Sequence, residues 1–245
     1  MWIPRWIGEV YSQVYWEYRT ELFTFEEALR LLNVPQNKLA VCFSKLHKMG
    51  ILLIFRRGKP RRYRLLDPEN FLLLASEKIK PINIKQEAYV KLIYDSFRKL
   101  YSRYNLVSFL VYGSVARGTA RPESDLDLLV VSDDFRGSLA SRIEDLITVE
   151  KQVREEIQWL HTNRVYTTLS FYPLRRSEAE KSPILFLDLV DEAKILYDKE
   201  NFMKDILNRL NIRLIKMGAK KIFLENGTWY WDLKPDYQPL DYRFG

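Results

Sequence analysis

The sequence has few of the residues that build disulfide-linked, zinc-binding or membrane-spanning proteins. Its 245 residues include one cysteine and two histidines, which excludes an intrachain disulfide and a Cys/His zinc site. No apolar run reaches the roughly 18–20 residues of a membrane span, and the first residues lack the apolar centre of a signal peptide. With only nine Gly, ten Pro and 47% hydrophobic residues, the composition is neither disordered nor fibrous. We therefore expect a soluble, cytoplasmic protein of two modest domains, without a membrane partner.

Acidic residues are absent from one stretch of the chain, residues 28–66. This stretch holds ten of the 39 Lys and Arg residues, which leaves 29 basic and 32 acidic residues elsewhere. A basic block with such sharp limits predicts a polyanionic partner, with a solvated surface as the alternative.

The pattern within this basic block predicts two helices followed by a hairpin. Thr24, followed by two glutamates, indicates a capped helix that ends at residues 33–35, Asn-Val-Pro. Residues 36–49 have the spacing of a second amphipathic helix. Residues 51–55 and 63–66 are short apolar strands on either side of an arginine-rich turn.

With a preceding helix at residues 6–22, this order resembles the winged helix-turn-helix family. In that family the second helix enters the DNA major groove and the wing lies along the backbone. The resemblance implies that duplex DNA is a partner and that a winged helix domain spans residues 1–80. Protein contact is the alternative use of such a domain. The DNA-binding set it implies is Lys38, Lys45, Lys48, Arg56, Arg57, Lys59, Arg61 and Arg62.

A chemical signal lies at residues 106–131. Residues 106–112 form an apolar run typical of a strand buried on both faces, and the run stops at Gly113 and Ser114. Glycine lets the backbone approach a ligand, and a short helix from Ser114 to Arg117 would direct free N–H groups at phosphates. Arg117 and Arg121 add positive charge around this turn. We expect these four residues, together with Ser124, to bind a nucleotide.

Two carboxylates begin the next apolar strand. Asp125 and Asp127 are two residues apart, so in a strand they point to the same face. Their mutual repulsion is relieved by a divalent cation, and Mg²⁺ prefers one or two carboxylates together with phosphate oxygens and water. The two motifs together are the parts required for phosphoryl or nucleotidyl transfer.

The combination Gly-Ser, Arg-Gly and Ser-Asp-x-Asp between apolar strands resembles the nucleotidyltransferase superfamily of DNA polymerase beta, most closely its minimal branch. The resemblance implies an α/β (α+β) domain over residues 81–245, in which helices flank a small mixed sheet. It also implies that Gly113 and Ser114 bind the triphosphate of an NTP, and that Asp125 and Asp127 are catalytic and hold up to two Mg²⁺ ions. The segments LDLVDEAKILYD and TWYWDLKPDYQP are similar to archaeal members.

The third carboxylate of that family, the general base, is missing from its expected strand at residues 165–172. The polar face of this strand would carry Thr168 and Ser170, and neither hydroxyl is a base near neutral pH. Either water or a more distant acid replaces it, or the activity is weak or lost. The nearest other acids are Glu155, Glu156, Glu178, Asp188 and Asp191.

Helical spacing elsewhere predicts helices at residues 85–104, 138–161, 182–197 and 201–217. We expect Trp229, Tyr230 and Trp231 to attach the C-terminal segment to the body, with base stacking as the alternative.

These patterns predict a Mg²⁺-dependent nucleotidyltransferase tethered to a DNA-binding winged helix. It would move a nucleoside monophosphate from an NTP to a hydroxyl on nucleic acid or on a protein, such as a toxin partner. One alternative is a transcriptional regulator whose second domain binds nucleotide with little or no turnover. Another is an antitoxin-like module that acts by contact. A homodimer is compatible with each.

Overall fold

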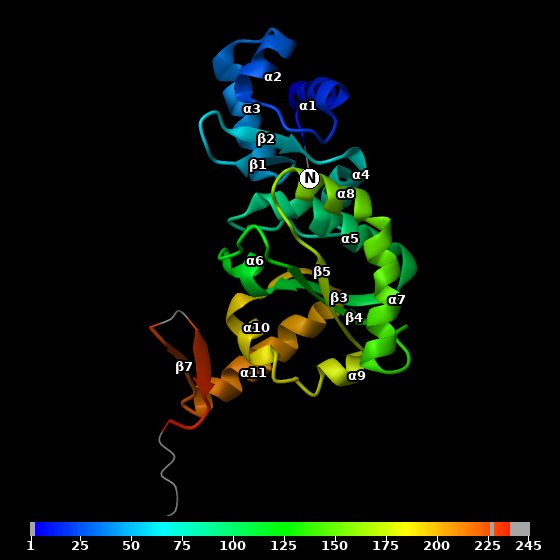
Figure 1. Ribbon diagram of the computed structural model, residues 1–245, viewed down its shortest axis with the longest axis vertical. Helices are drawn as coiled ribbons and strands as arrows, with labels where there is room; N and C mark the ends of the chain where they lie inside the picture. Colours follow the sequence, from blue (N-terminus) through cyan, green and yellow to red (C-terminus); the bar gives the residue numbers. More distant parts are fainter. Residues whose placement is uncertain (1–2, 226–227, 236–245) are drawn as a thin grey trace, which may run out of the picture.

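The N-terminal part of the protein consists of three helices and a β hairpin (Figure 1). The structure is a computed structural model that describes residues 3–225 and 228–235. The order of these elements is the order predicted from the sequence, and we refer to them together as the N-terminal unit. They are α1 (Arg5–Tyr18), α2 (Phe25–Leu32), α3 (Gln36–Lys48) and the antiparallel strands β1 (Leu52–Arg56) and β2 (Arg62–Leu65).

Local signals in the sequence set the limits of these helices. The Thr24 side chain accepts a hydrogen bond from the Glu27 N–H at 3.2 Å, and the Glu27 carboxylate accepts one from the Thr24 N–H at 2.6 Å. This capping box starts α2 where the sequence predicted it. The left-handed residue Asn33 ends α2, and Pro35 directly precedes α3.

The hairpin is buried on both faces. Leu52 and Leu65 pack into the core formed by helices α1–α3. Leu53 and Phe55 point the other way and belong to the core of the C-terminal part. Because successive residues of a strand alternate in direction, one short hairpin joins the two cores.

The C-terminal part is built on a four-stranded mixed sheet with the strand order β5-β4-β3-β6. Strands β4 and β5 run parallel, whereas β3 is antiparallel to both β4 and β6. The predicted small mixed sheet is thus confirmed. Its strands are β3 (Leu106–Tyr112), β4 (Leu126–Ser132), β5 (Leu169–Leu174) and β6 (Lys194–Asp198).

Helices cover both faces of this sheet (Figure 1). One face packs on α5 (Val90–Arg103), α7 (Leu139–Gln152) and α8 (Arg154–Thr162). The other packs on α9 (Arg176–Ala179), α10 (Phe186–Glu192) and α11 (Phe202–Lys216). The remaining described elements are α4 (Pro68–Ala75), α6 (Gly113–Arg117), the 3-10 turns Glu87–Tyr89 and Lys199–Asn201, and the hairpin β7 (Lys220–Phe223) and β8 (Trp229–Asp232).

Three predicted elements differ from the structure. The predicted helix at residues 138–161 is two helices, because Val153 has non-helical dihedral angles. The predicted strand at residues 165–172 begins only at Leu169. The predicted helix at residues 182–197 was wrong at its C-terminal end, where Lys194–Asp198 forms strand β6. The backbone N–H and C=O groups along this edge of β3 form hydrogen bonds with β6. Helical propensity describes only the local sequence, so it does not predict this pairing.

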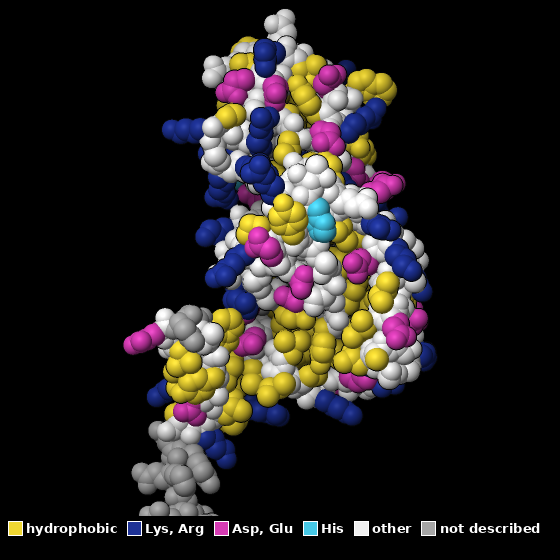
Figure 2. Space-filling model, viewed as in Figure 1, with side chains coloured by type: hydrophobic (Ala, Val, Ile, Leu, Met, Phe, Trp, Pro, Cys, Tyr) yellow, Lys and Arg dark blue, Asp and Glu magenta, His cyan; other side chains and the backbone are white. Residues whose placement is uncertain are grey.

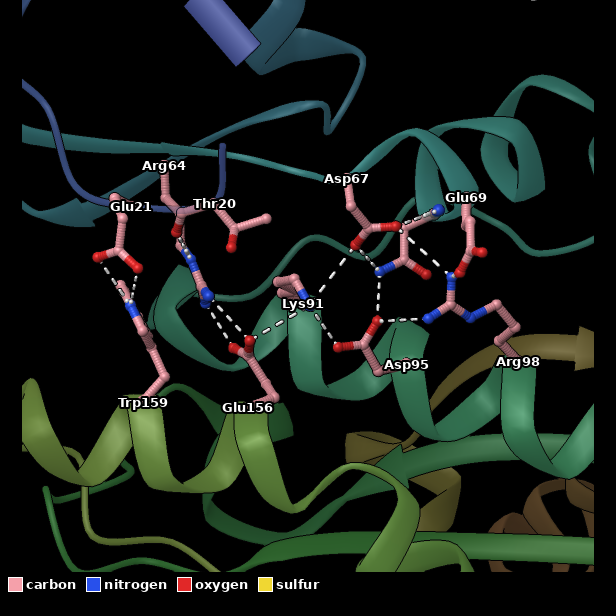
Figure 3. Close-up of polar contacts among 11 residues, drawn as sticks. Thr20, Glu21, Arg64, Asp67, Glu69, Lys91, Asp95, Arg98, Glu156 and Trp159 are labelled. Carbon is pink, nitrogen blue, oxygen red and sulfur yellow. Dashed lines mark hydrogen bonds and ion pairs between the residues drawn. The ribbon is translucent and has the colours of Figure 1, made fainter. Parts of the chain in front are cut away.

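A buried ion pair, linked to further ion pairs in α5 and α8, joins the N-terminal unit to the rest of the protein (Figure 3). Arg64 of β2 pairs with Glu156 of α8, and their side chains are 1% and 6% exposed. The Arg64 guanidinium also lies over the Trp159 ring, 3.4 Å from its centroid. Lys91 of α5 lies between Glu156 and Asp95, with its Nζ 3.2 Å and 2.6 Å from their carboxylates. We call these residues, with Asp67 and Arg98, the interface network.

Within the described residues, no helix combines the length and the apolar character needed to cross a bilayer.

Candidate active site

The turn after β3 closes directly on a carboxylate. Gly113 has a φ of +68°, in the left-handed region that favours glycine. A Cβ at this position would lie 3.0 Å from Asp127 Cγ and closer still to Asp127 Oδ2. Only glycine therefore allows the Asp127 side chain to lie against the turn.

The sheet register brings the two predicted carboxylates to this turn. Tyr112, directly before Gly113, pairs with Asp127 across β3 and β4. Asp125 is exposed at the start of β4, and Asp127 is half-buried. Burial raises the pKa of Asp127 and the nearby Asp125 raises it further, while Ser170 and Arg117 oppose the shift. Burial therefore disfavours the negative charge of Asp127 more than its neighbours in the chain compensate for it.

Hydroxyl groups occupy the position at which a third carboxylate was expected. Ser170 is the partner of Asp127 in the β4–β5 register and hydrogen-bonds to its side chain. The Thr168 Oγ1 donates to Asp125 Oδ1 at 2.7 Å. The polar face predicted for this segment therefore does point at the carboxylates, and it carries no acid.

Three of the other candidate acids have partners elsewhere in the fold. Glu156 pairs with Arg64 in the interface network. Glu178 Oε1 accepts hydrogen bonds from the guanidinium groups of Arg142, at 3.0 Å, and Arg175, at 2.7 Å. Asp188 accepts from the indole N–H groups of the C-terminal hairpin. In the described part of the chain, no group of three or more His, Cys, Asp or Glu residues is arranged to hold a metal ion.

The donor atoms at the site still fit a hard divalent cation. They are carboxylate oxygens of Asp125 and Asp127, with the hydroxyls of Thr168 and Ser170 beside them. Mg²⁺ commonly uses one or two protein carboxylates and takes its remaining ligands from water and substrate phosphates. The residues present therefore match Mg²⁺ or Mn²⁺ better than a metal that needs His or Cys.

The predicted nucleotide-binding residues lie in two places. Gly113, Ser114 and Arg117 belong to α6, beside Asp127. Arg117 pairs with Glu192 at 2.6 Å, and its guanidinium lies over the Trp229 ring. Arg121 lies in the loop that leads to β4, where the Ser124 Oγ accepts a hydrogen bond from its N–H at 2.9 Å.

One residue that holds this loop was missed in the sequence. The Tyr89 hydroxyl is 3.2 Å from the Arg121 carbonyl oxygen and 3.4 Å from that of Ser124. Burial raises its pKa to about 12, and Glu123 and Asp125 contribute. Because Tyr89 is about 35 residues from the motif, no local pattern could have indicated it.

The C-terminal hairpin is attached to the body as predicted. The Trp229 and Trp231 indole N–H groups donate to Asp188 Oδ1 at 3.0 Å and 3.2 Å. The segment TWYWDLKPDYQP, which is similar to archaeal nucleotidyltransferases, continues to Pro239, and its last residues, 236–239, lie outside the described residues.

The predicted DNA-binding cations differ in their surroundings. Lys38 and Lys45 extend over the Trp6 ring, and Lys48, Lys59 and Arg61 are exposed. Three arginines of the hairpin β1–β2 have partners inside the molecule. Arg56 donates to the Asn163 carbonyl oxygen, Arg57 pairs with Glu87, and Arg62 lies 3.7 Å from Glu27.

Comparison with known proteins agrees with this geometry. Residues 90–186 match the family described as "Nucleotidyltransferase domain", a range that includes β3, α6, β4 and β5. The chain is 31% identical over 121 residues to "Putative protein adenylyltransferase" of Methanocaldococcus jannaschii. This match covers 49% of the chain and 77% of that relative. The protein belongs to the nucleotidyltransferase family.

Solved structures resemble the chain more weakly. A toxin–antitoxin crystal structure with AMP-PNP covers 51% of this chain and 92% of its own, with 15% identity and a TM-score of 0.34. The archaeal chromatin protein TrmBL2 covers 82% of this chain and 89% of its own, with 14% identity and a TM-score of 0.21.

Proposed function

We propose that the protein is a divalent-cation-dependent nucleotidyltransferase that moves a nucleoside monophosphate from an NTP to a hydroxyl acceptor and releases pyrophosphate. The observation that carries this proposal is the contact between Gly113 and the Asp127 carboxylate. It brings a phosphate-binding turn and a pair of carboxylates into one small site, and the transfer reaction requires both.

Each part of the site has a role in this proposal. The N–H groups at Gly113 and Ser114 hold the triphosphate, the Ser124 hydroxyl hydrogen-bonds to the nucleotide, and Arg117 or Arg121 balances the charge of the phosphates. Asp125 and Asp127 hold Mg²⁺, with two ions in the family pattern. A bound Mg²⁺ would stabilise the charge that develops on the phosphate oxygens. Thr168 and Ser170 orient the carboxylates through hydrogen bonds, and the acceptor proton leaves to solvent because neither hydroxyl is a base.

We also propose that the N-terminal unit is a winged helix domain that binds duplex DNA. Its support is the exposed Lys38, Lys45 and Lys48 on α3 and the exposed Lys59 and Arg61 between the hairpin strands. Phosphate contacts of this kind fix position on the duplex more than they read sequence.

A second candidate function is a DNA-binding regulator, or an antitoxin-like protein, whose nucleotidyltransferase domain binds nucleotide without turnover. The observation that favours it is Ser170 at the register position opposite Asp127, where a third acid was expected.

Labelled-nucleotide transfer separates the two candidates. The full-length protein is incubated with each labelled NTP, Mg²⁺ or Mn²⁺, and oligonucleotide or protein acceptors. We expect labelled product with the wild-type protein and none with Asp127→Asn. Asp145→Asn, which removes one exposed carboxylate on α7, is the matched control and should retain activity.

Equilibrium dialysis of the same NTPs completes this test. Metal-dependent NTP binding without product in any acceptor arm would overturn the enzyme proposal and support the regulator. Absence of both binding and product would overturn both candidates.

A further inference from the structure

A cleft lies between the N-terminal hairpin and the loop that leads to Asp125. Its volume is about 480 Å³, and it is lined by residues 54–57, 85–89, 120–122 and 163–165. We call it the interdomain cleft, because its walls come from both parts of the molecule. Its volume is in the range of roughly 300–1,000 Å³ found for ligand sites. Neither Asp125 nor Asp127 lines it.

Among the charged residues that line the interdomain cleft, cations outnumber acids. The single acid among its lining residues, Glu87, is buried and already engaged. Its carboxylate accepts a hydrogen bond from the Ile54 N–H at 2.7 Å and lies 3.3 Å from the Arg57 guanidinium. Five cations line the cleft: Arg56, Arg57, Lys85, Arg121 and Arg164.

Most of this charge is uncompensated. Lys85, Arg121 and Arg164 are exposed, and their side chains form no hydrogen bond or ion pair with other residues that the structure describes. Arg56 donates to the neutral Asn163 carbonyl oxygen at 2.6 Å, which leaves its charge free. Arg164 also has a backbone φ of +63°, a conformation in which Gly or Asn is less strained than Arg.

The remaining wall is apolar, and the cleft adjoins the candidate active site. Phe55, Pro122 and Val165 are among its apolar lining residues. Tyr166, which follows the lining residue Val165 and is 51% exposed, donates its backbone N–H to the Pro122 carbonyl oxygen. Figure 2 shows Lys and Arg side chains gathered along one edge of the molecule, from the N-terminal unit to the level of α6.

We infer that the interdomain cleft binds the end of a single nucleic-acid strand. Unpaired cations attract its phosphates, while the apolar wall suits sugars and bases. A cleft of this volume accommodates nucleotides of one strand, whereas a duplex is read from outside through its grooves. In the proposed function, the bound strand presents its terminal hydroxyl to Asp125 and Asp127, and this part of the inference rests on that function. The binding itself does not.

Oligonucleotide binding tests this inference without any NTP. Fluorescence anisotropy measures the affinity of a labelled single strand for the full-length protein at several salt concentrations. The test variant is Lys85→Ala/Arg164→Ala, which removes two exposed cations that line the cleft. Lys204→Ala/Arg209→Ala on α11 removes the same charge from two exposed positions that do not line the cleft. Thermal unfolding of each variant verifies that it is folded.

We expect weaker strand binding for the cleft variant and little change for the α11 variant. The slope of log affinity against log salt should become shallower by about 0.7 for each phosphate that the variant no longer neutralises. A strand carrying a photoreactive base at its end should crosslink to peptides of the cleft, and this product should be absent with the cleft variant.

Several results would overturn the inference. One is equal weakening by both variants, and another is no weakening by either. Competition by free NTP or by an acidic peptide as effective as that by the strand would assign the cleft to those ligands. If duplex DNA binding were weakened by the cleft variant to the same extent as single-strand binding, the loss of affinity would be assigned to the N-terminal unit. Cleft-dependent strand binding by a protein without transfer activity would sustain this inference while the proposed function fails.

Discussion

At the scale of single residues, the candidate site depends on one glycine and two hydroxyl side chains. Gly113 leaves room for Asp127, and Ser170 and Thr168 hydrogen-bond to the two carboxylates. The sequence alone predicted the glycine, the carboxylates and the polar face of the segment with Thr168 and Ser170. It could not show that the Asp127 side chain fills the space beside Gly113, because that contact depends on the register of β3 with β4.

The raised pKa of Asp127 has a consequence for stability. An acid whose pKa is raised by folding binds its proton more tightly in the folded state, so folding loses stability as pH rises through the raised pKa. Asp127→Asn removes this loss and should raise the melting temperature at neutral pH, by about 2–4 °C for each kcal/mol gained.

A pH series of melting temperatures measures this effect. The advantage of Asp127→Asn should shrink as pH falls from the raised pKa of Asp127 toward the ordinary pKa of Asp, and it should be absent below that value, where the wild-type side chain is neutral in both states. A lower melting temperature for the variant at neutral pH would contradict the burial of an uncompensated charge. Asp145→Asn serves as the exposed control and should shift little.

At the scale of elements, the sequence predicted best where local signals act. The capping box at Thr24, Pro35 before α3 and the glycine turn after β3 fix element limits within a few residues. Strand β6 was missed because KILYD continues the helical pattern of α10, and only pairing with β3 makes it a strand. The break at Val153 was missed for a similar reason, since the apolar spacing of α7 continues into α8.

The contact between α7 and the start of α9 gives a prediction for acid stability. Arg142, 3% exposed, donates to Glu178, and Arg175 adds further hydrogen bonds. Together they lower the pKa of Glu178 to about 2. A carboxyl with a lowered pKa stabilises the fold above its ordinary pKa of 4.5 and loses this effect as pH falls toward 2.

Glu178→Gln should therefore cost about 1.5–3 kcal/mol at neutral pH, since Arg142 loses its charged acceptor. Urea denaturation at neutral pH and near pH 3 measures the difference, which should diminish at the lower pH. An equal loss at both pH values would show that the effect is not electrostatic. Glu144→Gln, at an exposed position on α7, is the control.

At the scale of the whole molecule, the interface network determines how the two parts fit together. Arg64 was counted in the sequence among the cations of the basic block, yet its side chain is 1% exposed and paired with Glu156. Burial alone would lower the pKa of Lys91, but Glu156 and Asp95 raise it above its ordinary value. The pairing of Arg64 and Lys91 with Glu156 joins residues that are far apart in the chain, so it cannot be read from local sequence patterns.

Removing one partner of this network should strongly destabilise the protein. Glu156→Ala leaves the buried Arg64 without its counter-charge and should cost about 3–5 kcal/mol. The neighbouring Glu155 is exposed, so Glu155→Ala should change stability by less than about 0.5 kcal/mol. Urea denaturation of both variants gives the comparison.

A double variant distinguishes charge imbalance from poorer packing. Arg64→Met/Glu156→Leu removes both charges and fills similar space, so it should recover most of the stability that Glu156→Ala removes. If Glu156→Ala unfolds at the same urea concentration as Glu155→Ala, the network does not contribute to stability.

The hairpin β1–β2 packs into two hydrophobic cores at once, because Leu52 belongs to one core and Leu53 to the other. A hairpin held in both cores prevents the N-terminal unit and the C-terminal part from rotating independently of each other. A molecule bound by α3 would therefore lie at a constant distance and angle from the carboxylates of β4. Under the proposed function, an acceptor would then be selected by whether its hydroxyl reaches Asp125 and Asp127, without specific contacts to the loop between α6 and β4.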